Sequence, residues 1–295
     1  MNSLTLFSPA GAVRLAAPLA RAVRRLGALG FSVDVDEAAR SRVQRFAGDD
    51  ATRLAAVHRV AAAAPSIAMA TRGGYGMTRL LDAIDWPLLA ASVERGTRWV
   101  GCSDITALQL GMLAHGRASS WAGPLAIDDF GRDEVDDVTA PCFVEAMSGV
   151  LEAVGFRTDA GFDGLDCSGL LWGGNLTVLC SLLGTPHWPK VRGGILFVED
   201  VNEHPYRVER MLLQLLQAGV IGAQKAVVLG AFTAWKPTLM DRGYGLQEAV
   251  AALRSRTDVP VLGGLPYGHV PTHVTLPVGR RAQLLVDGRN ALIGW

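Results

Sequence analysis

The 295-residue sequence contains little lysine, few cysteines and no excess of either charge. Only three of its 28 basic residues are lysines, and 28 acidic residues balance them. A formal net charge of zero provides neither the basic surface that nucleic acids require nor a polybasic segment for acidic membranes. We therefore expect neither nucleic acid nor a membrane as a partner.

The four cysteines, at positions 102, 142, 167 and 180, form no C-x-x-C pair. Their spacing fits neither a zinc site nor a disulfide framework. The first residues, M-N-S-L-T-L-F-S-P-A-G, include no basic residue ahead of the apolar ones, so we expect no signal peptide. Glycine and proline turns, one of them expected at 173–175, interrupt the uncharged stretch 167–189, which argues against a membrane span. Together these features predict a soluble, cytoplasmic protein.

What the sequence does contain is enough apolar material for two cores. Hydrophobic residues make up 49% of the chain and charged residues 19%, as in globular proteins. The length suits two domains rather than one. The apolar pattern loosens before residue 166, which predicts an N-terminal domain over 1–150, a linker over 151–166 and a C-terminal domain over 167–295.

Short apolar runs alternate with helical patterns in the first half. Strands are expected at 4–7, 31–35, 66–70 and 99–100, with helices between them. Asp50 could cap one of these helices, and another is expected to carry Leu80, Leu81 and Ile84. This alternation predicts an α/β fold with a doubly wound, mostly parallel sheet flanked by helices. The second half predicts a smaller, mixed α/β domain that ends in a hairpin turning near Asp287 and Gly288.

A serine lies on the expected strand-to-helix turn of the segment T-R-W-V-G-C-S-D-I-T-A-L (97–108). Such a turn can expose the Ser103 hydroxyl while the following backbone N–H groups point the same way, which suits nucleophilic catalysis. Alternatively, Ser103 only caps the helix that follows. The loop R-G-G-Y-G (72–76) ends the preceding strand, and it is either a tight turn or a site for an anion or oxyanion. No G-K-[ST] follows it, so a phosphate loop is not expected.

A serine nucleophile needs a histidine base, and the histidine needs an orienting carboxylate. Glu199 is the best-placed carboxylate because it ends a buried strand, whereas none of the six histidines stands out by spacing alone. A metal site could use the cluster 199–204 or the pair of His269 and His273. Pro271 separates that pair, and acidic residues favour a helix N-terminus in any case. We therefore expect no metal and no cofactor.

Five motifs occur together and in order, and jointly they resemble the LD-carboxypeptidase family, the muramoyl-tetrapeptide carboxypeptidases. They are R-G-G-Y-G (72–76), G-C-S-D-I-T-A-L (101–108), G-G-N-L (173–176) with L-G-T (183–185), F-V-E-D-V-N-E-H-P-Y-R-V-E-R (197–210) and L-P-Y-G-H (265–269). The resemblance covers nearly the whole chain. The family also includes microcin-immunity peptidases, which share the catalytic machinery and differ in substrate.

The resemblance implies a serine carboxypeptidase with Ser103 as nucleophile, His269 as general base and Glu199 as the carboxylate that orients it. It further implies an oxyanion hole formed by the backbone N–H groups of Gly74 and Asp104. The backbone amide of Asp104, rather than its carboxylate, is the group expected to act. The implied substrate is cytoplasmic murein tetrapeptide, cleaved at the L,D bond to release D-Ala during peptidoglycan recycling, and the implied assembly is a homodimer.

Three positions depart from the family pattern: Cys102 before the nucleophile, Asn202 where glycine is usual, and Val270 after the histidine. None of them removes a catalytic group. Other functions stay open at this point: a microcin-immunity-like peptidase acting on a peptidyl nucleotide or another amide, and a muropeptide-binding protein without catalysis. An α/β-hydrolase esterase is less favoured, because G-C-S-D-I is not G-x-S-x-G.

Overall fold

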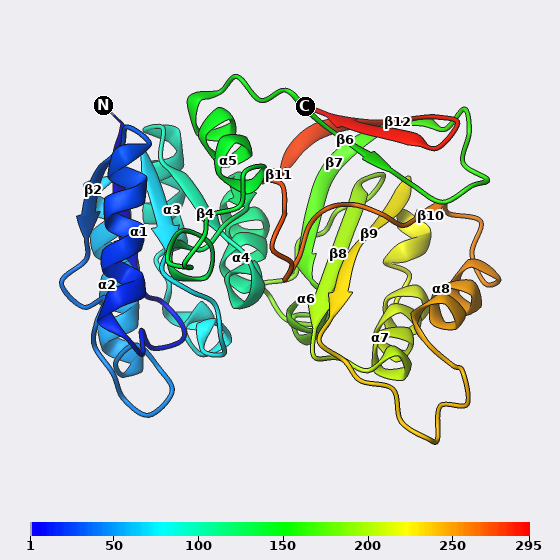
Figure 1. The fold of residues 1–295 in the computed structure, drawn as a ribbon, viewed down its shortest axis with the longest axis horizontal. Helices are drawn as coiled ribbons and strands as arrows, with labels where there is room; N and C mark the ends of the chain where they lie inside the picture. The colour runs from blue at the N-terminus through cyan, green and yellow to red at the C-terminus, as the bar shows by residue number, and fades with distance from the viewer. Residues whose placement is uncertain (1) are drawn as a thin grey trace. The chain divides into compact units, whose positions relative to one another are not determined.

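Strands and helices alternate along residues 2–295, which the computed structural model describes, and they divide between two units (Figure 1). The first unit comprises residues 2–151 together with Gly184–Pro189 and Pro271–Gly279. The second comprises Glu152–Leu183, Lys190–Val270 and Arg280–Trp295. Each unit is built on one sheet.

The sheet of the first unit has six strands in the order β11-β5-β4-β3-β1-β2. Every neighbouring pair is parallel except β5 and β11, which are antiparallel. A parallel sheet buried on both faces favours continuous apolar strands, and β3, of sequence I-A-M-A, is buried at all four residues. The strands are β1 (Ser3–Phe7), β2 (Ser32–Val35), β3 (Ile67–Ala70), β4 (Arg98–Gly101), β5 (Ser120–Ala122) and β11 (Leu276–Val278).

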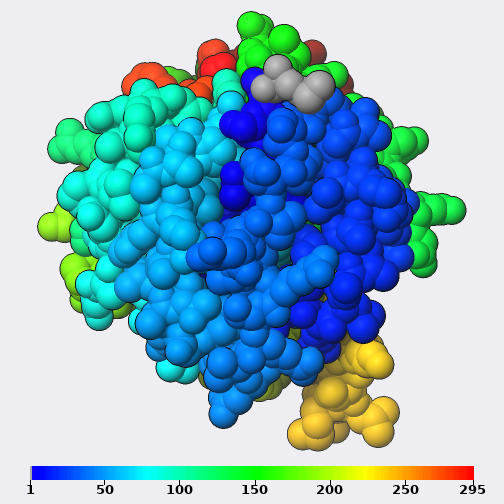
Figure 2. All heavy atoms as spheres, turned by 90° about the vertical axis from the view of Figure 1, so that its left-hand side faces the viewer, coloured from blue at the N-terminus to red at the C-terminus, as the bar shows by residue number. Residues whose placement is uncertain are grey.

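Five α-helices and several single turns connect these strands. Figure 2 shows this unit from the side on which β2 lies in Figure 1, where residues of the N-terminal part of the chain, in blue, make up most of the surface. The helices are α1 (Ala16–Ala28), α2 (Asp50–Ala63), α3 (Trp86–Glu94), α4 (Thr106–Gly116) and α5 (Thr139–Ser148). The 3-10 turns are η1 (Met77–Arg79), η2 (Leu81–Ala83) and η3 (Ser103–Ile105), and a π-helical turn, η4, spans Ala126–Phe130.

The strand order brings three loops to one edge of this sheet. Strands β4, β3 and β1 are consecutive neighbours and run parallel, so the loops that follow them leave from the same edge. These loops are 8–11 after β1, 71–76 after β3 and 102–104 after β4. The carboxyl edge of such a sheet is where doubly wound folds bind their ligands.

The sheet of the second unit has seven strands in the order β10-β9-β8-β7-β12-β13-β6. Strands β7 to β10 pair in parallel, and β12, β13 and β6 add antiparallel neighbours. The strands are β6 (Ala153–Arg157), β7 (Asp166–Asn175), β8 (Ile195–Val201), β9 (Ala226–Thr233), β10 (Val261–Leu262), β12 (Arg280–Asp287) and β13 (Asn290–Gly294). The helices are α6 (Leu176–Ser181), α7 (Pro205–Gln217) and α8 (Leu246–Arg254), with a 3-10 turn, η5, at Ile221–Ala223.

The predicted α/β fold class is confirmed, with a mostly parallel sheet in the first unit and a mixed sheet in the second. The terminal hairpin is also present, as β12 and β13. Helix α7 buries Val208, Leu212 and Leu215, which lie on one face at helical spacing.

Several local expectations differ from the structure. Helix α2 is capped by Asp49, whose carboxylate accepts from the Thr52 N–H at 2.8 Å, and Asp50 is already its first residue. The helix expected around Leu80 and Ile84 consists only of η1 and η2. The turn expected at 173–175 is instead the end of strand β7, which runs directly into α6.

The division into units is less simple than two consecutive domains joined by a linker. The expected linker 151–166 contains β6, which pairs with β13 at the edge of the second sheet. Two later segments belong to the first unit, because Leu276–Val278 pairs with β5 and His187 contacts Asp82. Hydrophobic patterning could not reveal these returns, because each is shorter than ten residues.

None of the helices formed by residues 2–295 combines the length and the apolar composition that crossing a membrane requires.

The packing of α4 against Trp86 generates a stability prediction. A Cβ at Gly111 would lie 2.2 Å from the Trp86 ring, so we expect Gly111→Ala to destabilise the protein by about 1–3 kcal/mol despite alanine's better helix propensity. Gly27 of α1 is the matched control, because a Cβ there meets nothing within 4 Å. Gly27→Ala should be neutral or stabilising by up to about 1 kcal/mol. Thermal and urea unfolding measure both, and equal effects of the two changes would contradict the packing argument.

Candidate active site

Ser103 occupies a strained turn between β4 and α4. Its φ of 62° lies in the left-handed region, which a non-glycine residue adopts at a cost of about 1–3 kcal/mol. The residue opens the single turn η3, and neither η3 nor α4 receives a side-chain cap hydrogen bond. The helix-cap interpretation of Ser103 is therefore not supported. A strained serine at the carboxyl end of a buried strand is instead the local geometry of a nucleophile turn.

The loop 72–76 lies directly against this serine. A Cβ built on Gly73 would lie 2.7 Å from Ser103 Cβ, 2.8 Å from its Oγ and 3.5 Å from the Asp104 backbone nitrogen. Only glycine permits this approach. The loop is also fixed to the first strand's loop, because the Gly11 N–H donates to the Gly73 oxygen at 3.0 Å. Gly74 is the glycine of this loop that is expected to act, whereas Gly73 is the one in contact with the serine.

Gly74, the expected oxyanion donor, follows that contact and has a φ of 89°. A Cβ at this position would lie 3.4 Å from Gly11 Cα and would carry a left-handed backbone strain as well. Gly74 is thus held in a conformation that suits glycine. Its proposed role as an N–H donor stays a prediction, as does that of the Asp104 amide.

The Asp104 side chain has contacts that the sequence did not reveal. Its carboxylate is buried, with 5% of the residue exposed, and Oδ2 accepts from the Met77 N–H at 2.7 Å. Burial raises the pKa of Asp104 to about 6, and the hydrogen bond from Met77 opposes that rise. No sequence signal marks this contact, because its donor is a backbone group.

In the second unit, Glu199 and His269 are brought together. Glu199 is completely buried near the end of β8, and its Oε2 lies 2.7 Å from His269 Nδ1. A carboxylate at this nitrogen keeps the proton on Nδ1 and leaves Nε2 as the basic side of the ring. The His269 side chain is 26% exposed, so this pair joins a buried charge to a solvent-accessible imidazole.

Two further residues hold Glu199 and His269 in place. Asn175 Nδ2 donates to Glu199 Oε1 at 3.2 Å, so each carboxylate oxygen has its own partner. The Asn175 Oδ1 accepts from the Val178 N–H and caps α6, which fixes the amide orientation. Gly268 has a φ of 132°, and a Cβ there would lie 3.0 Å from Glu199 Oε2. The glycine before the histidine therefore leaves room for the carboxylate.

The acidic cluster 199–204 does not assemble as a metal site. Asp200 Oδ2 accepts from the backbone and hydroxyl of Thr177 at 2.8 and 2.7 Å, and His204 Nε2 lies 3.1 Å from Asp241 Oδ2. Within residues 2–295 no group of three or more His, Cys, Asp or Glu is arranged to hold a metal ion. Asn202 has a φ of 65°, a conformation that glycine and asparagine adopt most readily, so its departure from glycine preserves the turn.

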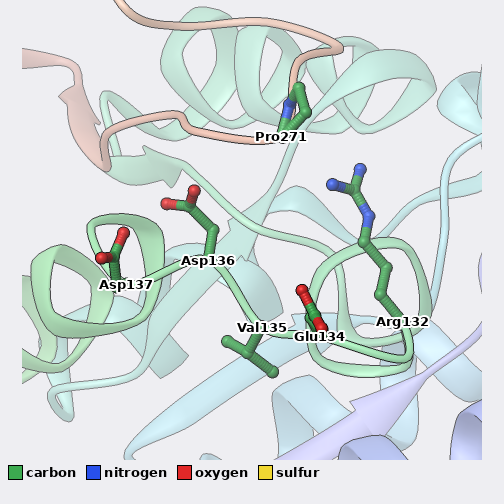
Figure 3. Close-up of a pocket in the computed structure, with 6 residues that line it drawn as sticks. All are labelled: Arg132, Glu134, Val135, Asp136, Asp137 and Pro271. Atoms are coloured by element: carbon green, nitrogen blue, oxygen red, sulfur yellow. The ribbon is translucent and has the colours of Figure 1, made fainter.

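A separate hollow in the first unit is lined mainly by acidic residues, and these residues have a structural role. Its volume is about 390 Å³, and Figure 3 shows that Arg132, Glu134 and Asp136 come from one loop while Pro271 comes from a distant segment. Partial burial acts to raise the pKa of Asp136, but hydrogen bonds from Thr272 and Thr139 lower it to about 2. Asp136 therefore anchors the returning segment, and none of the expected site residues lines this hollow.

The residues expected to act thus form two groups, each complete within its own unit. Ser103, Asp104 and Gly74 lie at the carboxyl edge of the first sheet, and Glu199 with His269 lies in the second unit. The first group contains a strained serine with backbone amides beside it, and the second a histidine with a buried carboxylate. Both are components of acyl-transfer chemistry.

Comparison with known proteins places the chain in a family. Residues 4–123 match the LD-carboxypeptidase N-terminal domain, and residues 168–284 match the LD-carboxypeptidase C-terminal domain. The murein tetrapeptide carboxypeptidase of Pseudomonas aeruginosa is 31% identical over 297 residues, which cover 95% of this chain and 92% of that protein. The crystal structure of muramoyltetrapeptide carboxypeptidase from Oxalobacter formigenes is 40% identical, covers 99% of this chain and 97% of that one, and has a TM-score of 0.91.

The microcin C7 self-immunity protein MccF of Escherichia coli is a more distant relative, 26% identical over 257 residues, which cover 76% of this chain and 72% of that protein. The wild-type MccF structure matches with a TM-score of 0.87 at 22% identity, covering 100% of this chain and 96% of that one, and so shows a common fold alone. The two domain matches together span most of the sequence. The chain therefore belongs to the LD-carboxypeptidase family of peptidases.

Proposed function

We propose that this protein is a serine carboxypeptidase that releases the terminal D-Ala from murein tetrapeptides by hydrolysing an L,D amide bond. In this proposal Ser103 is the nucleophile, His269 the general base and Glu199 the carboxylate that orients the histidine. The backbone N–H groups of Gly74 and Asp104 stabilise the oxyanion.

The observation that carries the proposal is the hydrogen bond between His269 Nδ1 and the fully buried Glu199 carboxylate. A buried charge is costly unless it is paired, so a carboxylate kept at this position indicates a role for the imidazole that it orients. Three other carboxylates also approach histidines, at His187, His204 and His273, and each of them contacts the Nε2 atom. His269 differs from these three histidines because its carboxylate partner lies at Nδ1 and is completely buried, which leaves Nε2 to act as the base.

The proposed reaction proceeds in two halves. His269 Nε2 takes the proton from Ser103 Oγ while the oxygen attacks the carbonyl carbon of the L,D bond. The tetrahedral oxyanion collapses, the bond to the D-Ala nitrogen breaks, and His269 returns its proton to the leaving amine. Water then attacks the acyl-enzyme with His269 again as base, which releases the shortened peptide and restores the serine.

The substrate assignment is supported by the relatives. Proteins whose names specify murein tetrapeptide as substrate align over nearly the full length of both chains. The microcin-immunity relative supports an alternative, a serine peptidase acting on a peptidyl nucleotide or another amide. Comparing turnover of murein tetrapeptide with that of an aminoacyl sulfamoyl nucleotide would separate the two. We further propose that the enzyme acts in the cytoplasm, in peptidoglycan recycling, as a homodimer.

The primary test of the function is product analysis by mass spectrometry on defined muropeptides. The wild-type protein should convert tetrapeptide to tripeptide with release of one D-Ala and should leave tripeptide intact. Ser103→Ala should lower kcat at least about 10³-fold because the nucleophile is lost. Ser148→Ala, at the exposed end of α5, should retain full activity. Retained turnover in Ser103→Ala would refute the proposed nucleophile.

The Glu199–His269 pair generates a second prediction. Glu199→Gln keeps the shape of the side chain but removes the charge that holds the imidazole tautomer, so kcat should fall about 10²- to 10⁴-fold with little change in KM. The matched control is Asp241→Asn, which alters the carboxylate beside His204 in the same unit. Steady-state kinetics of both variants on tetrapeptide provide the comparison. Similar losses in the two variants would argue against a specific role for Glu199.

A further inference from the structure

In one peptide group of the loop beside the candidate nucleophile, both the N–H and the C=O form hydrogen bonds with buried, charged side chains. The N–H of the Gly76–Met77 peptide donates to Asp104 Oδ2 at 2.7 Å. The carbonyl oxygen of the same peptide accepts from Arg53 Nη1 at 2.8 Å. Asp104 and Arg53 thus hold one peptide group from opposite sides, with opposite charges.

Other contacts of Arg53 hold its guanidinium in place against the Gly76 carbonyl oxygen. The residue is completely buried, and Nη1 also donates to the Pro9 oxygen at 2.9 Å in the loop after β1. Its Nη2 forms an ion pair with Asp50. A Cβ at Gly76 would lie 2.7 Å from Arg53 Nη1, so only glycine lets the guanidinium reach this carbonyl. The arginine therefore fixes the far end of the loop that began at Gly73.

The near end of the loop is fixed at Gly73, through its contact with Ser103 and the hydrogen bond from Gly11. Gly74 lies between these two anchored points. Because Asp104 follows Ser103 directly, its side chain links the loop to the nucleophile turn, and its backbone carries the other proposed oxyanion donor. Asp104 therefore carries one proposed oxyanion donor on its backbone, and its side chain holds the loop that carries the other.

We propose that Asp104 and Arg53 are positioning residues that clamp the Gly76–Met77 peptide and so align the N–H groups of Gly74 and Asp104 for the oxyanion. This inference rests on the proposed serine mechanism and assigns the side chain of Asp104 a role of its own. Preorganised donors stabilise an oxyanion because they need no rearrangement during the reaction.

The electrostatics distinguish this role from a purely structural one. Burial raises the pKa of Asp104 to about 6, above its ordinary value of 3.8, and the charges facing it are those of Arg53 and Arg45. A carboxyl whose pKa is raised in the folded state contributes most to stability at low pH, and that contribution is lost as the pH rises through 6. At neutral pH the ionised carboxylate therefore costs stability. Its contribution there is to position the loop.

The experiment compares Asp104→Asn with Asp129→Asn. Asp129 is the matched control, since it lies in the same unit, is 7% exposed and accepts from the Leu125 N–H at 2.7 Å. Two rates are measured at pH 7.5: D-Ala release from tetrapeptide, and labelling of Ser103 by a fluorophosphonate, which needs no peptide recognition. Loss of one oxyanion donor lowers kcat about 10²- to 10³-fold. Misalignment of the N–H groups of Gly74 and Asp104 should therefore lower kcat about 10-fold or more.

We expect Asp104→Asn to lower kcat and the labelling rate at least about 10-fold, with KM within about threefold and a melting temperature that does not fall. Asp129→Asn should keep both rates within about threefold. A fall in rate that follows the melting temperature equally in both variants would overturn the clamp, as would a rise in KM at constant kcat. If the wild type is labelled but releases no D-Ala, the proposed substrate is wrong, and the labelling rates alone still test the positioning role. If Ser103 is not labelled at all, both the serine mechanism and the positioning role are rejected.

A second measurement applies to the wild-type protein if Asp104→Asn fails to fold. The amide resonance of Met77 should shift with pH around 6 as Asp104 gains a proton. The exchange rate of the Gly74 amide, corrected for its intrinsic pH dependence, should rise over the same range. A Gly74 exchange rate that stays constant while the Met77 resonance shifts would overturn the proposed positioning role.

Discussion

The close approach of Gly73 to Ser103 is the constraint on which the first unit's candidate site depends. Ser103 has a left-handed φ, and the neighbouring loop can lie so near to it only because Gly73 has no side chain. The hydrogen bond from Gly11 to Gly73 extends the constraint to the loop after β1. Three loops that are distant in sequence are thus interlocked by backbone contacts at one sheet edge.

In the second unit, the His269 imidazole is held by the Glu199 carboxylate, which is not exposed to water. Glu199 is fully buried, and its two oxygens are divided between Asn175 and His269. The register of β8 against β9 shifts between Val198 and Asp200, so the strand is irregular at the glutamate itself. Glycine at position 268 then lets the histidine-bearing loop pass close to the carboxylate. Burial supplies rigidity here, and the hydrogen bonds compensate the charge.

Much of the fold could be predicted from the sequence, because buried parallel strands and amphipathic helices have periodic signatures. The alternation in the first half, helix α7 and the terminal hairpin follow from that periodicity. Strand β6 was missed, because only its Val154 is buried and so no apolar run marks it. The segment 271–279 was missed because its strand is three residues long and joins a sheet whose other members lie before residue 123. Pairing between distant short segments depends on tertiary contacts, which local patterns do not encode.

The same distinction explains which parts of the candidate site could be anticipated. Ser103, Glu199 and His269 were singled out because reactive side chains belong to few residue types, and their motifs resemble a family. The carboxylate of Asp104 and the guanidinium of Arg53 were not, because both bind main-chain groups of Gly76 and Met77, and every residue presents such groups. A contact with the backbone can still be recognised in the sequence where it requires a glycine, because only glycine lets another group come so close to the main chain. In the loop 72–76, Gly73, Gly74 and Gly76 lie against Ser103, Gly11 and Arg53 respectively. Each glycine therefore indicates in the sequence a close contact that the residue type of the contacting partner does not indicate.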